Sequence, residues 1–290
     1  MFEICLRLDR NQTIASEILL EDLGAVSISL EDAEDHPIFV EQVGSTPLWK
    51  NVTLTALFVD DVDQPALQKS LEQALEAAVE VNKKEIHDQD WHKVWMQNFQ
   101  PMQFGERLWV CPSWMTYPDP FAINIRLDPG LAFGTGTHGT TALCLQWLAN
   151  YPLINKSVLD FGCGSGILAI AAFYLGAKKI YAIDHDPQAI EATELNAKNN
   201  GVDKCCIHIH LADTPPQEKF DVLLANVLLT PLIEFAPQFA NILQPSGRLI
   251  LSGILTSQLE SLENAYKEFF KFNVIHSQNE WLLIEASLLN

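Results

Sequence analysis

The stretch VLDFGCGSGILAIA, residues 158–171, constrains the fold of this chain more than any other. An apolar run that fits a buried strand leads directly into glycines at 162, 164 and 166, and a second apolar run follows. A strand, a glycine-rich turn and a helix in this order open the nucleotide-binding α/β folds, where the backbone of the turn lies against the ligand. The pattern departs from the dinucleotide fingerprint G-x-G-x-x-G, because Ile167 stands where the third glycine would be.

Strand and helix patterns alternate from Ser157 onward. Apolar runs predict strands at 157–161, 179–184, 205–213, 220–227 and 247–253. Helical spacing predicts helices at 167–176, 187–201, 229–243 and 257–270. This alternation is typical of a doubly wound, Rossmann-like parallel sheet in an α/β domain. Two final strands, at 272–277 and 280–288, are close enough in sequence to pair antiparallel at its edge.

The N-terminal part has a different pattern, and we expect a separate small α+β domain of ferredoxin-like type at residues 1–87. Alternating residues predict strands at 2–8, 25–32, 51–60 and 83–88, and helical spacing predicts helices at 13–24 and 64–80. This segment has no glycine-rich loop and no cluster of catalytic residue types. We therefore expect it to bind a partner.

A helix at residues 88–100 is expected to link this domain to a second domain at 101–290. Trp91, Trp95 and Phe99 recur every four residues and would form one aromatic stripe before Pro101 ends the helix. Such a stripe is more typical of a packing surface than of a cofactor site, so we expect it to pack on the larger domain.

Most of the net charge of −19 lies in the N-terminal third, where residues 1–100 hold 7 Lys and Arg against 19 Asp and Glu. Such a surface repels the phosphates of nucleic acids and attracts a basic macromolecule. We therefore expect a basic protein partner and no direct nucleic-acid partner. The alternative is that the acidity only keeps the chain soluble. A monomer is favoured.

Other features of composition narrow the class of protein. The longest strongly apolar stretch, residues 167–175, is far shorter than the roughly 20 residues that cross a bilayer, and the first residues are charged rather than signal-like. A cytoplasmic protein without a membrane partner is expected. The six cysteines form no C-x-x-C pair, so we expect reduced thiols and no metal site. His208 and His210 lack a third ligand nearby and fit ordinary strand positions.

Charged residues end successive predicted strands, where the ligand of an open α/β sheet lies. Asp160 ends the first strand, and Gly162 and Gly164 follow it, which lets the backbone approach a ligand closely. Asp184 ends the second strand, 22 residues after Gly162, where a carboxylate can accept both hydroxyls of a ribose. Asp213 ends the third strand, in reach of an adenine edge. Together these residues predict an adenosine ligand.

The lack of phosphate-binding features decides which adenosine ligand is favoured. A pyrophosphate needs the third glycine that Ile167 replaces, no Walker-type G-K-[ST] occurs, and the turn contains no Lys or Arg. S-adenosylmethionine carries no phosphate, and its sulfonium cation suits a pocket with Asp160, Asp184 and Asp213. We therefore predict a class I methyltransferase domain that binds S-adenosylmethionine.

A second glycine-rich stretch, LDPGLAFGTGTHGTTALCLQWL, lies at residues 127–148 and runs into a helix predicted to begin near Thr140 or Thr141. One interpretation is a flexible connector, since glycine- and threonine-rich loops need no ligand. The other is a segment, with Phe133 and the neighbouring hydroxyls, that closes over the methionine half of the cofactor.

These motifs, together with DWHKVWMQNFQP, AIDHDPQAIEATELNAKNNG and ANVLLTPL, resemble the bacterial ribosomal protein L11 methyltransferase family over residues 88–290. Residues 1–85 match that family only in size and pattern. The resemblance implies an enzyme that uses S-adenosylmethionine to methylate lysine side chains and the N-terminal amine of a large-subunit ribosomal protein, usually to the trimethyl state. It also implies that the N-terminal domain docks this substrate and that Thr141, Gly162, Asp184 and Asn226 contact the cofactor. Gly139 departs from the family pattern, because many relatives have a bulkier residue there.

Asn226 ends the fourth predicted strand and is the predicted catalytic residue. Methyltransferases that act on planar amides or base amines follow this Asn with Pro-Pro-aromatic, whereas Val227 and Leu228 follow it here. This favours an aliphatic amine, which Asn226 would orient through its carbonyl oxygen. Positioning should supply most of the catalysis, and desolvation and the sulfonium should lower the pKa of the lysine.

Three points stay open at the level of sequence. His138 is either a proton acceptor or a residue that holds the backbone of its loop. An NAD-dependent oxidoreductase that tolerates the shifted glycine is one alternative to the methyltransferase. A non-catalytic module that binds S-adenosylmethionine without turnover is the other.

Overall fold

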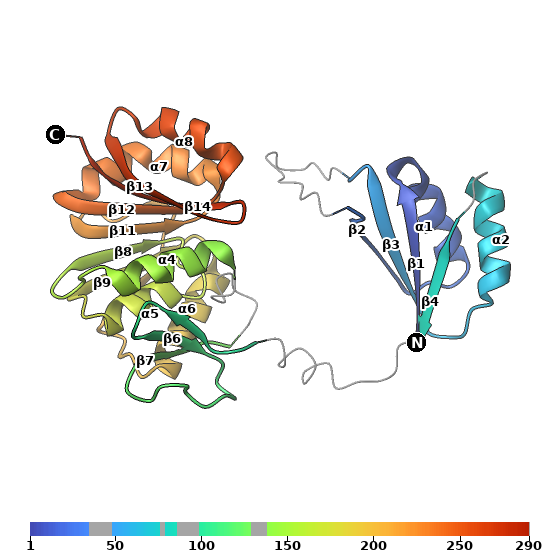
Figure 1. Cartoon of the computed structure of the whole chain (residues 1–290), viewed down its shortest axis with the longest axis horizontal. Coiled ribbons are helices and arrows are strands. Elements are labelled where there is room, and N and C mark those ends of the chain that lie inside the picture. The colour runs from blue at the N-terminus through green and yellow to red at the C-terminus, as the bar shows by residue number, and fades with distance from the viewer. Residues whose placement is uncertain (35–47, 76–78, 86–98, 129–137, 290) are drawn as a thin grey trace. The chain divides into compact units, whose positions relative to one another are not determined.

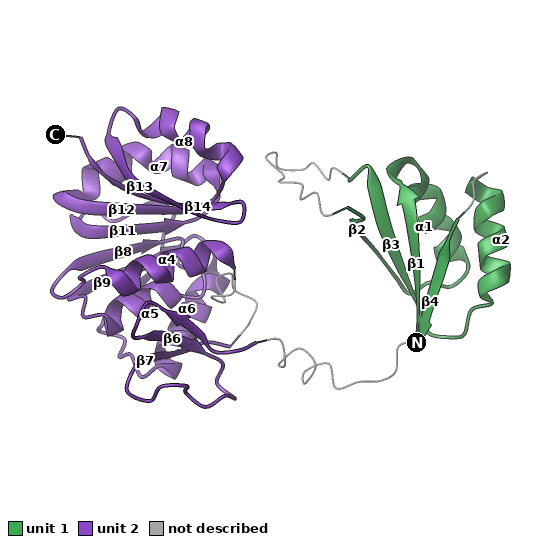
Figure 2. Ribbon diagram, viewed as in Figure 1, with its two compact units in different colours: residues 1–94 green, residues 95–290 purple. Residues whose placement is uncertain are grey.

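The computed structural model describes residues 1–34, 48–75, 79–85, 99–128 and 138–289. The chain divides into two compact units, residues 1–94 and 95–290 (Figure 2). The domain boundary predicted after residue 87 lies outside the described residues, and so does most of the linker helix predicted at 88–100, with Trp91 and Trp95. The boundary and the linker helix therefore stay predictions.

Unit 1 has the strand and helix order predicted for it. Its elements are β1 (Phe2–Asp9), α1 (Thr13–Asp22), β2 (Ser27–Asp32), β3 (Asn51–Phe58), α2 (Gln64–Leu75) and β4 (Val81–Glu85). The sheet order is β2-β3-β1-β4, and all three pairings are antiparallel. This is the ferredoxin-like arrangement, in which β1 and β3 are the two central strands.

The core of unit 1 follows from the alternation along its central strands. Ile4 and Leu6 of β1 and Leu54 of β3 are buried, and Leu20 of α1 and Leu71 of α2 pack in the same cluster. The last strand begins two residues earlier than predicted and ends at Glu85, because Val81 is buried in this core and pairs with Leu6.

Unit 2 contains a seven-stranded sheet in its described residues (Figure 1). Its strands are β8 (Ser157–Phe161), β9 (Lys179–Asp184), β10 (Ile207–Leu211), β11 (Phe220–Asn226), β12 (Leu243–Leu255), β13 (Phe270–Gln278) and β14 (Trp281–Leu288). Its helices are α4 (Gly139–Asn150), α5 (Ile167–Tyr174), α6 (Pro187–Asn199), α7 (Leu229–Ile242) and α8 (Leu259–Tyr266).

The strand order β10-β9-β8-β11-β12-β14-β13 confirms the doubly wound prediction. The five strands from β10 to β12 are parallel, and β14 and β13 form the predicted antiparallel pair at one edge. Helices α4, α5 and α6 lie on one face of the sheet, and α7 and α8 lie on the other (Figure 1). The sheet is therefore the middle layer between two apolar clusters.

Several local features differ from expectation. A three-stranded sheet of β5 (Met102–Phe104), β6 (Leu108–Cys111) and β7 (Ile123–Arg126) precedes α4 and was not predicted. Strand β8 has the predicted bounds 157–161, so Phe161 rather than Asp160 is its last residue, whereas β10 ends two residues before Asp213. Within the described residues, no helix combines the length and apolarity needed to span a bilayer.

Candidate active site

A cavity of about 630 Å³ opens at the carboxyl ends of the parallel strands. Strands β8 and β11 are neighbours there although β9 and β10 come between them in the chain, so the connections leave the sheet in opposite directions. Such a reversal point is where open α/β sheets bind ligands. The described lining residues are His138, Thr140, Phe161, Gly162, Gly164, Ile183, Asp184, His185, Ala212, Asp213, Asn226, Val227, Leu228, Pro231, Glu234, Phe235, Gly253 and Trp281.

The glycine turn after β8 forms one wall of this cavity. Gly162 (φ 72°), Gly164 (φ 53°) and Gly166 (φ 75°) all have left-handed backbone conformations, which other residues rarely adopt. A Cβ on Gly162 would lie 2.2 Å from Cγ1 of Val227, so the loop after β11 packs where a side chain would otherwise stand. Gly162 and Gly164, which the sequence predicts to bind the cofactor, both line the cavity.

Two side chains of α6 hold this turn, and sequence reasoning missed both. Thr193 Oγ1 donates a hydrogen bond to the carbonyl oxygen of Gly164 (3.0 Å), and Asn196 Nδ2 donates to the carbonyl oxygen of Ser165 (2.9 Å). Thr193 is fully buried. The available signal was their spacing, because two polar residues three positions apart lie on one face of a helix that otherwise buries alanines.

Asp184 ends β9, as predicted, and its carboxylate reaches the glycine turn. Its Oδ2 accepts the N–H of Gly164 (2.9 Å), and its Oδ1 accepts the N–H of Asp186 (3.1 Å). Each carboxylate oxygen can accept two hydrogen bonds, so both keep capacity for a ribose hydroxyl. Asp213 and Glu234 also line the cavity, and none of its described lining residues is Lys or Arg. The charge of the site therefore favours a cationic ligand over a phosphate.

Asn226 ends β11 and contacts Thr141 of α4, which lies 85 residues earlier in the chain. Its Nδ2 donates to Thr141 Oγ1 (3.4 Å). Its Oδ1 is buried and has no hydrogen-bond partner in the part of the chain that the structure describes. A buried oxygen without a partner costs about 1–3 kcal/mol, so this atom retains the capacity to accept a ligand N–H. Thr141 does not itself line the cavity.

His138 caps the start of α4, which begins at Gly139, one residue before the earlier of its two predicted starts. Its Nδ1 lies 3.4 Å from the N–H of Thr140, which donates to it, and 2.8 Å from Thr140 Oγ1. Burial lowers the pKa of this imidazole below its usual value, so the ring is neutral at pH 7. Of the two interpretations open in the sequence, the geometry supports a role in holding the backbone.

Asp160 lies beneath the cavity wall. It is buried, does not line the cavity, and accepts the N–H of Ala169 (3.0 Å) at the start of α5. Burial raises the pKa of this carboxyl to about 7, and the negative charge of Asp184 adds to the effect. Its predicted contact with the cofactor stays a prediction. Phe133 and its neighbours at 129–137 lie outside the described residues.

These residues fit S-adenosylmethionine better than a dinucleotide. The buried Asn226 Oδ1 lacks a partner, the turn at Gly162 leaves no room for a Cβ, and acidic side chains line the cavity. A pyrophosphate would need positive charge or the third glycine, and Ile167 is a buried core residue at that position.

Comparison with known proteins agrees with this assignment. The family model described as ribosomal protein L11 methyltransferase (PrmA) matches residues 1–288. The protein named ribosomal protein L11 methyltransferase from Azotobacter vinelandii is 48% identical to this chain over 285 residues, which cover 98% of each of the two chains. The protein of the same name from Glaesserella parasuis is 49% identical over 285 residues, which cover 96% of each. The crystal structure of ribosomal protein L11 methylase from Lactobacillus delbrueckii subsp. bulgaricus matches with a TM-score of 0.61 and 34% identity, covering 66% of this chain and 100% of that one. The chain therefore belongs to the ribosomal protein L11 methyltransferase family.

Proposed function

We propose that this chain transfers methyl groups from S-adenosylmethionine to lysine side-chain and N-terminal amines of the large-subunit ribosomal protein L11. The observation that carries this proposal is the buried Asn226 Oδ1, which has no partner within the described residues and belongs to a residue of the cavity wall. An amine that donates one N–H to this oxygen has its nitrogen fixed in position, and positioning is what a methyl transfer needs most.

The residues at the other end of the cavity suit the nucleoside. Asp184 would accept the ribose hydroxyls, and Asp213, which also lines the cavity, would meet the adenine edge. Gly162 and Gly164 expose backbone to the methionine part, and Thr141 would act on it through its bond to Asn226. When bound, S-adenosylmethionine supplies the methyl carbon, activated by the sulfonium.

Apolar side chains that follow Asn226 in the chain line the cavity, which suits an amine that must react in its neutral form. Val227, Leu228 and Phe235 line it, and no Pro-Pro-aromatic clamp for a planar group follows Asn226. A lysine has a pKa near 10.4 in water, and loss of hydration together with a nearby positive charge lowers this value. With a lowered pKa, the substrate ammonium would lose its proton to solvent before the methyl transfer. The described residues therefore need no dedicated base.

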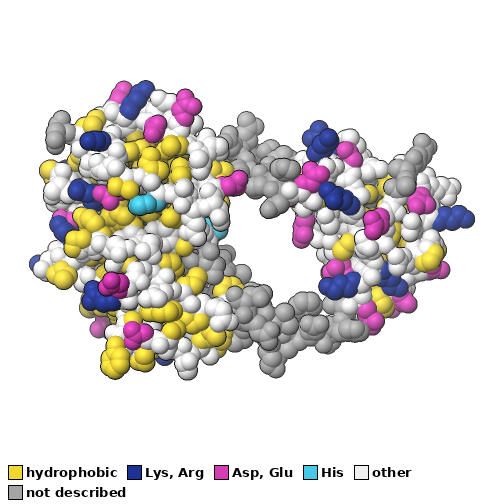
Figure 3. Space-filling view, in the orientation of Figure 1, with side chains coloured by type: hydrophobic (Ala, Val, Ile, Leu, Met, Phe, Trp, Pro, Cys, Tyr) yellow, Lys and Arg dark blue, Asp and Glu magenta, His cyan; other side chains and the backbone are white. Residues whose placement is uncertain are grey.

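Unit 1 suits the docking of a basic protein. The outer face of α1 exposes Ile14 (68%) and Ile18 (56%), one turn apart, and Glu17, Glu21 and Asp22 share that face. Asp and Glu side chains are also spread over the side of unit 1 that Figure 3 shows. A protein that binds ribosomal RNA must carry positive charge to neutralise phosphates, so L11 complements this face. We also propose that the protein acts in the cytoplasm, where such a substrate is made, and that it is a monomer.

Two experiments test the proposal against its alternatives. S-adenosylhomocysteine should raise the melting temperature of the protein and NAD should not; the reverse result would favour an oxidoreductase. Incubation with methyl-labelled S-adenosylmethionine and ribosomal proteins that lack this modification should label L11. Cofactor binding without any labelled protein would favour the non-catalytic module.

A further inference from the structure

Trp281 lies at the acceptor end of the cavity, although nothing in its sequence context marks it. It is the first residue of β14 and pairs with Leu255, at the carboxyl end of β12. In the sheet order, β14 is four strands away from β9, which carries Asp184. At about 4.8 Å per strand, the two residues stand at opposite ends of the cavity mouth, about 19 Å apart along the sheet.

The indole of Trp281 packs against the start of α4. Its ring centroid lies 4.8 Å from that of His138, edge to face. A Cβ on Gly139 would lie 3.2 Å from its Cδ1, so the absence of a side chain at Gly139 allows this close approach. Two residues further along α4, Thr141 receives the hydrogen bond from Asn226. Trp281 and Asn226 both line the cavity, and only β12 lies between their two strands.

Successive methylation removes what Asn226 can recognise. In each round the nitrogen lone pair forms the N–C bond, the S–C bond breaks, and its electron pair goes to sulfur. The proton released after the first and second rounds goes to solvent. A neutral primary amine can donate an N–H to Asn226 Oδ1, but the neutral amine that already carries two methyl groups has no N–H left. The last round needs a contact that does not depend on a hydrogen-bond donor.

An indole face meets this requirement. In the last round positive charge moves onto a nitrogen that Asn226 no longer holds, and the π face of a tryptophan stabilises such an alkylammonium by about 0.5–2 kcal/mol. We propose that Trp281 sets how many methyl groups the acceptor amine receives, by holding the amine in the last round, when Asn226 no longer can. This inference rests on the proposed function.

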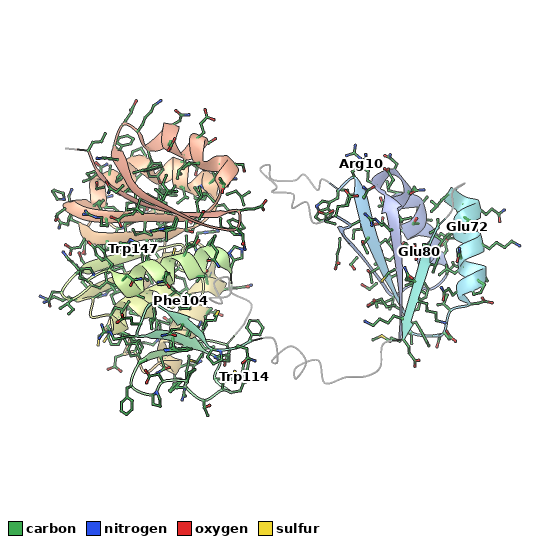
Figure 4. All side chains as sticks on the ribbon, in the orientation of Figure 1. Arg10, Glu72, Glu80, Phe104, Trp114 and Trp147 are labelled. Atoms are coloured by element: carbon green, nitrogen blue, oxygen red, sulfur yellow. The ribbon has the colours of Figure 1, made fainter. Side chains whose placement is uncertain are left out.

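Product distributions measured by mass spectrometry test it. Trp281→Leu should leave the rate of the first methylation within about threefold and slow the conversion of dimethyl to trimethyl product about tenfold, whereas Trp281→Phe should keep most of that conversion. The matched control is Trp147→Leu (Figure 4), which removes an indole from α4 that stacks on Tyr151 outside the cavity. An equal slowing of all three rounds by Trp281→Leu would show a merely structural role and overturn the proposal.

A binding measurement separates this inference from the proposed function. With S-adenosylhomocysteine present, the wild-type protein and Trp147→Leu should bind a trimethyllysine peptide about fivefold more tightly than the same peptide with a neutral tert-butyl isostere. Trp281→Leu should lose most of this preference, because only the acidic lining residues then favour the charged peptide. Equal binding by the wild type would refute the role of the indole, whereas failure of the wild type to methylate L11 would refute the proposed function and leave this comparison readable.

Discussion

Asp184 Oδ2 accepts the backbone N–H of Gly164 across 2.9 Å, so the residue that ends β9 fixes the turn that follows β8. The same carboxylate lines the cavity and accepts a second N–H from Asp186. One side chain therefore shapes the glycine turn and faces the ligand that the turn would hold. Because Asp184 both holds the turn and supplies negative charge at the cavity, the turn itself can lack charged residues.

Replacement of Asp184 by Asn should weaken the binding of S-adenosylhomocysteine by about 1.5–3 kcal/mol, which is about tenfold to 150-fold in Kd, because a charged acceptor is lost. Isothermal titration measures this. The matched control is Asp186→Asn, which removes a charge two residues away, preserves a good N-cap for α6 and does not touch the cavity. Similar losses in both variants would indicate long-range charge rather than direct contact.

Replacement of Asn226 by Ala should lower turnover with little effect on stability. The variant loses the acceptor for the amine, and we expect kcat for L11 to fall about 100-fold. It removes a buried oxygen without a partner but also the bond from Nδ2 to Thr141, so the free energy of unfolding should stay within about 1 kcal/mol of the wild type. Steady-state kinetics at saturating cofactor and urea unfolding measure the two quantities. Wild-type turnover, or a marked loss of stability, would contradict the role of Asn226.

Residues at strand ends could be placed from the sequence because the fold itself brings them together. Asp184 and Asn226 are 42 positions apart, yet parallel strands end at one edge of a sheet, and both line the cavity. The glycines of the turn could also be predicted from the sequence, since residues other than glycine rarely adopt their positive φ angles.

Other parts of the site depend on register and pairing, which the sequence does not show. Strand β8 extends one residue beyond Asp160, and side chains alternate between faces, so Phe161 lines the cavity while Asp160 bonds to Ala169. Trp281, near the C-terminus, lines the cavity only because β14 pairs with β12. A pattern of single elements carries no information on such a contact.

Replacement of Asp160 by Asn should remove a pH dependence of stability. The pKa of this carboxyl is raised by burial from 3.8 to about 7, so the folded state binds a proton that the unfolded state has released between pH 4 and pH 7. Wild-type stability should therefore fall relative to the variant as pH rises through this window, by about 4 kcal/mol in total, and level off above pH 7. Urea unfolding across pH 4.5–8.5 measures it, and parallel curves would contradict the assignment.

Replacement of both Ile14 and Ile18 by Ser should raise KM for L11 about tenfold and leave kcat and the affinity for S-adenosylhomocysteine unchanged. The exposed face of α1 would lose the apolar area that docking buries. Ile154→Ser is the matched control, because Ile154 is 73% exposed and belongs to unit 2. An unchanged KM in the double variant would exclude this face as the docking surface.

Replacement of Gly162 by Ala should destabilise the fold through two separable effects. Its φ of 72° strains any L-residue, at a cost of about 1–2 kcal/mol. The new Cβ would also lie 2.2 Å from Cγ1 of Val227, and Val227 must then move together with Asn226 beside it. Gly201→Ala isolates the first effect, because Gly201 has a φ of 69° and nothing within 4 Å of the added Cβ.

The collision itself can be measured by a double-mutant cycle with Val227→Ala, which removes Cγ1. The double variant should be more stable than the sum of the single effects by about 1–3 kcal/mol, and it should recover part of the lost turnover, since Asn226 can return to its place. Strict additivity of the two substitutions would mean that the loop after β11 adjusts freely. The glycine turn would then not determine where Asn226 lies.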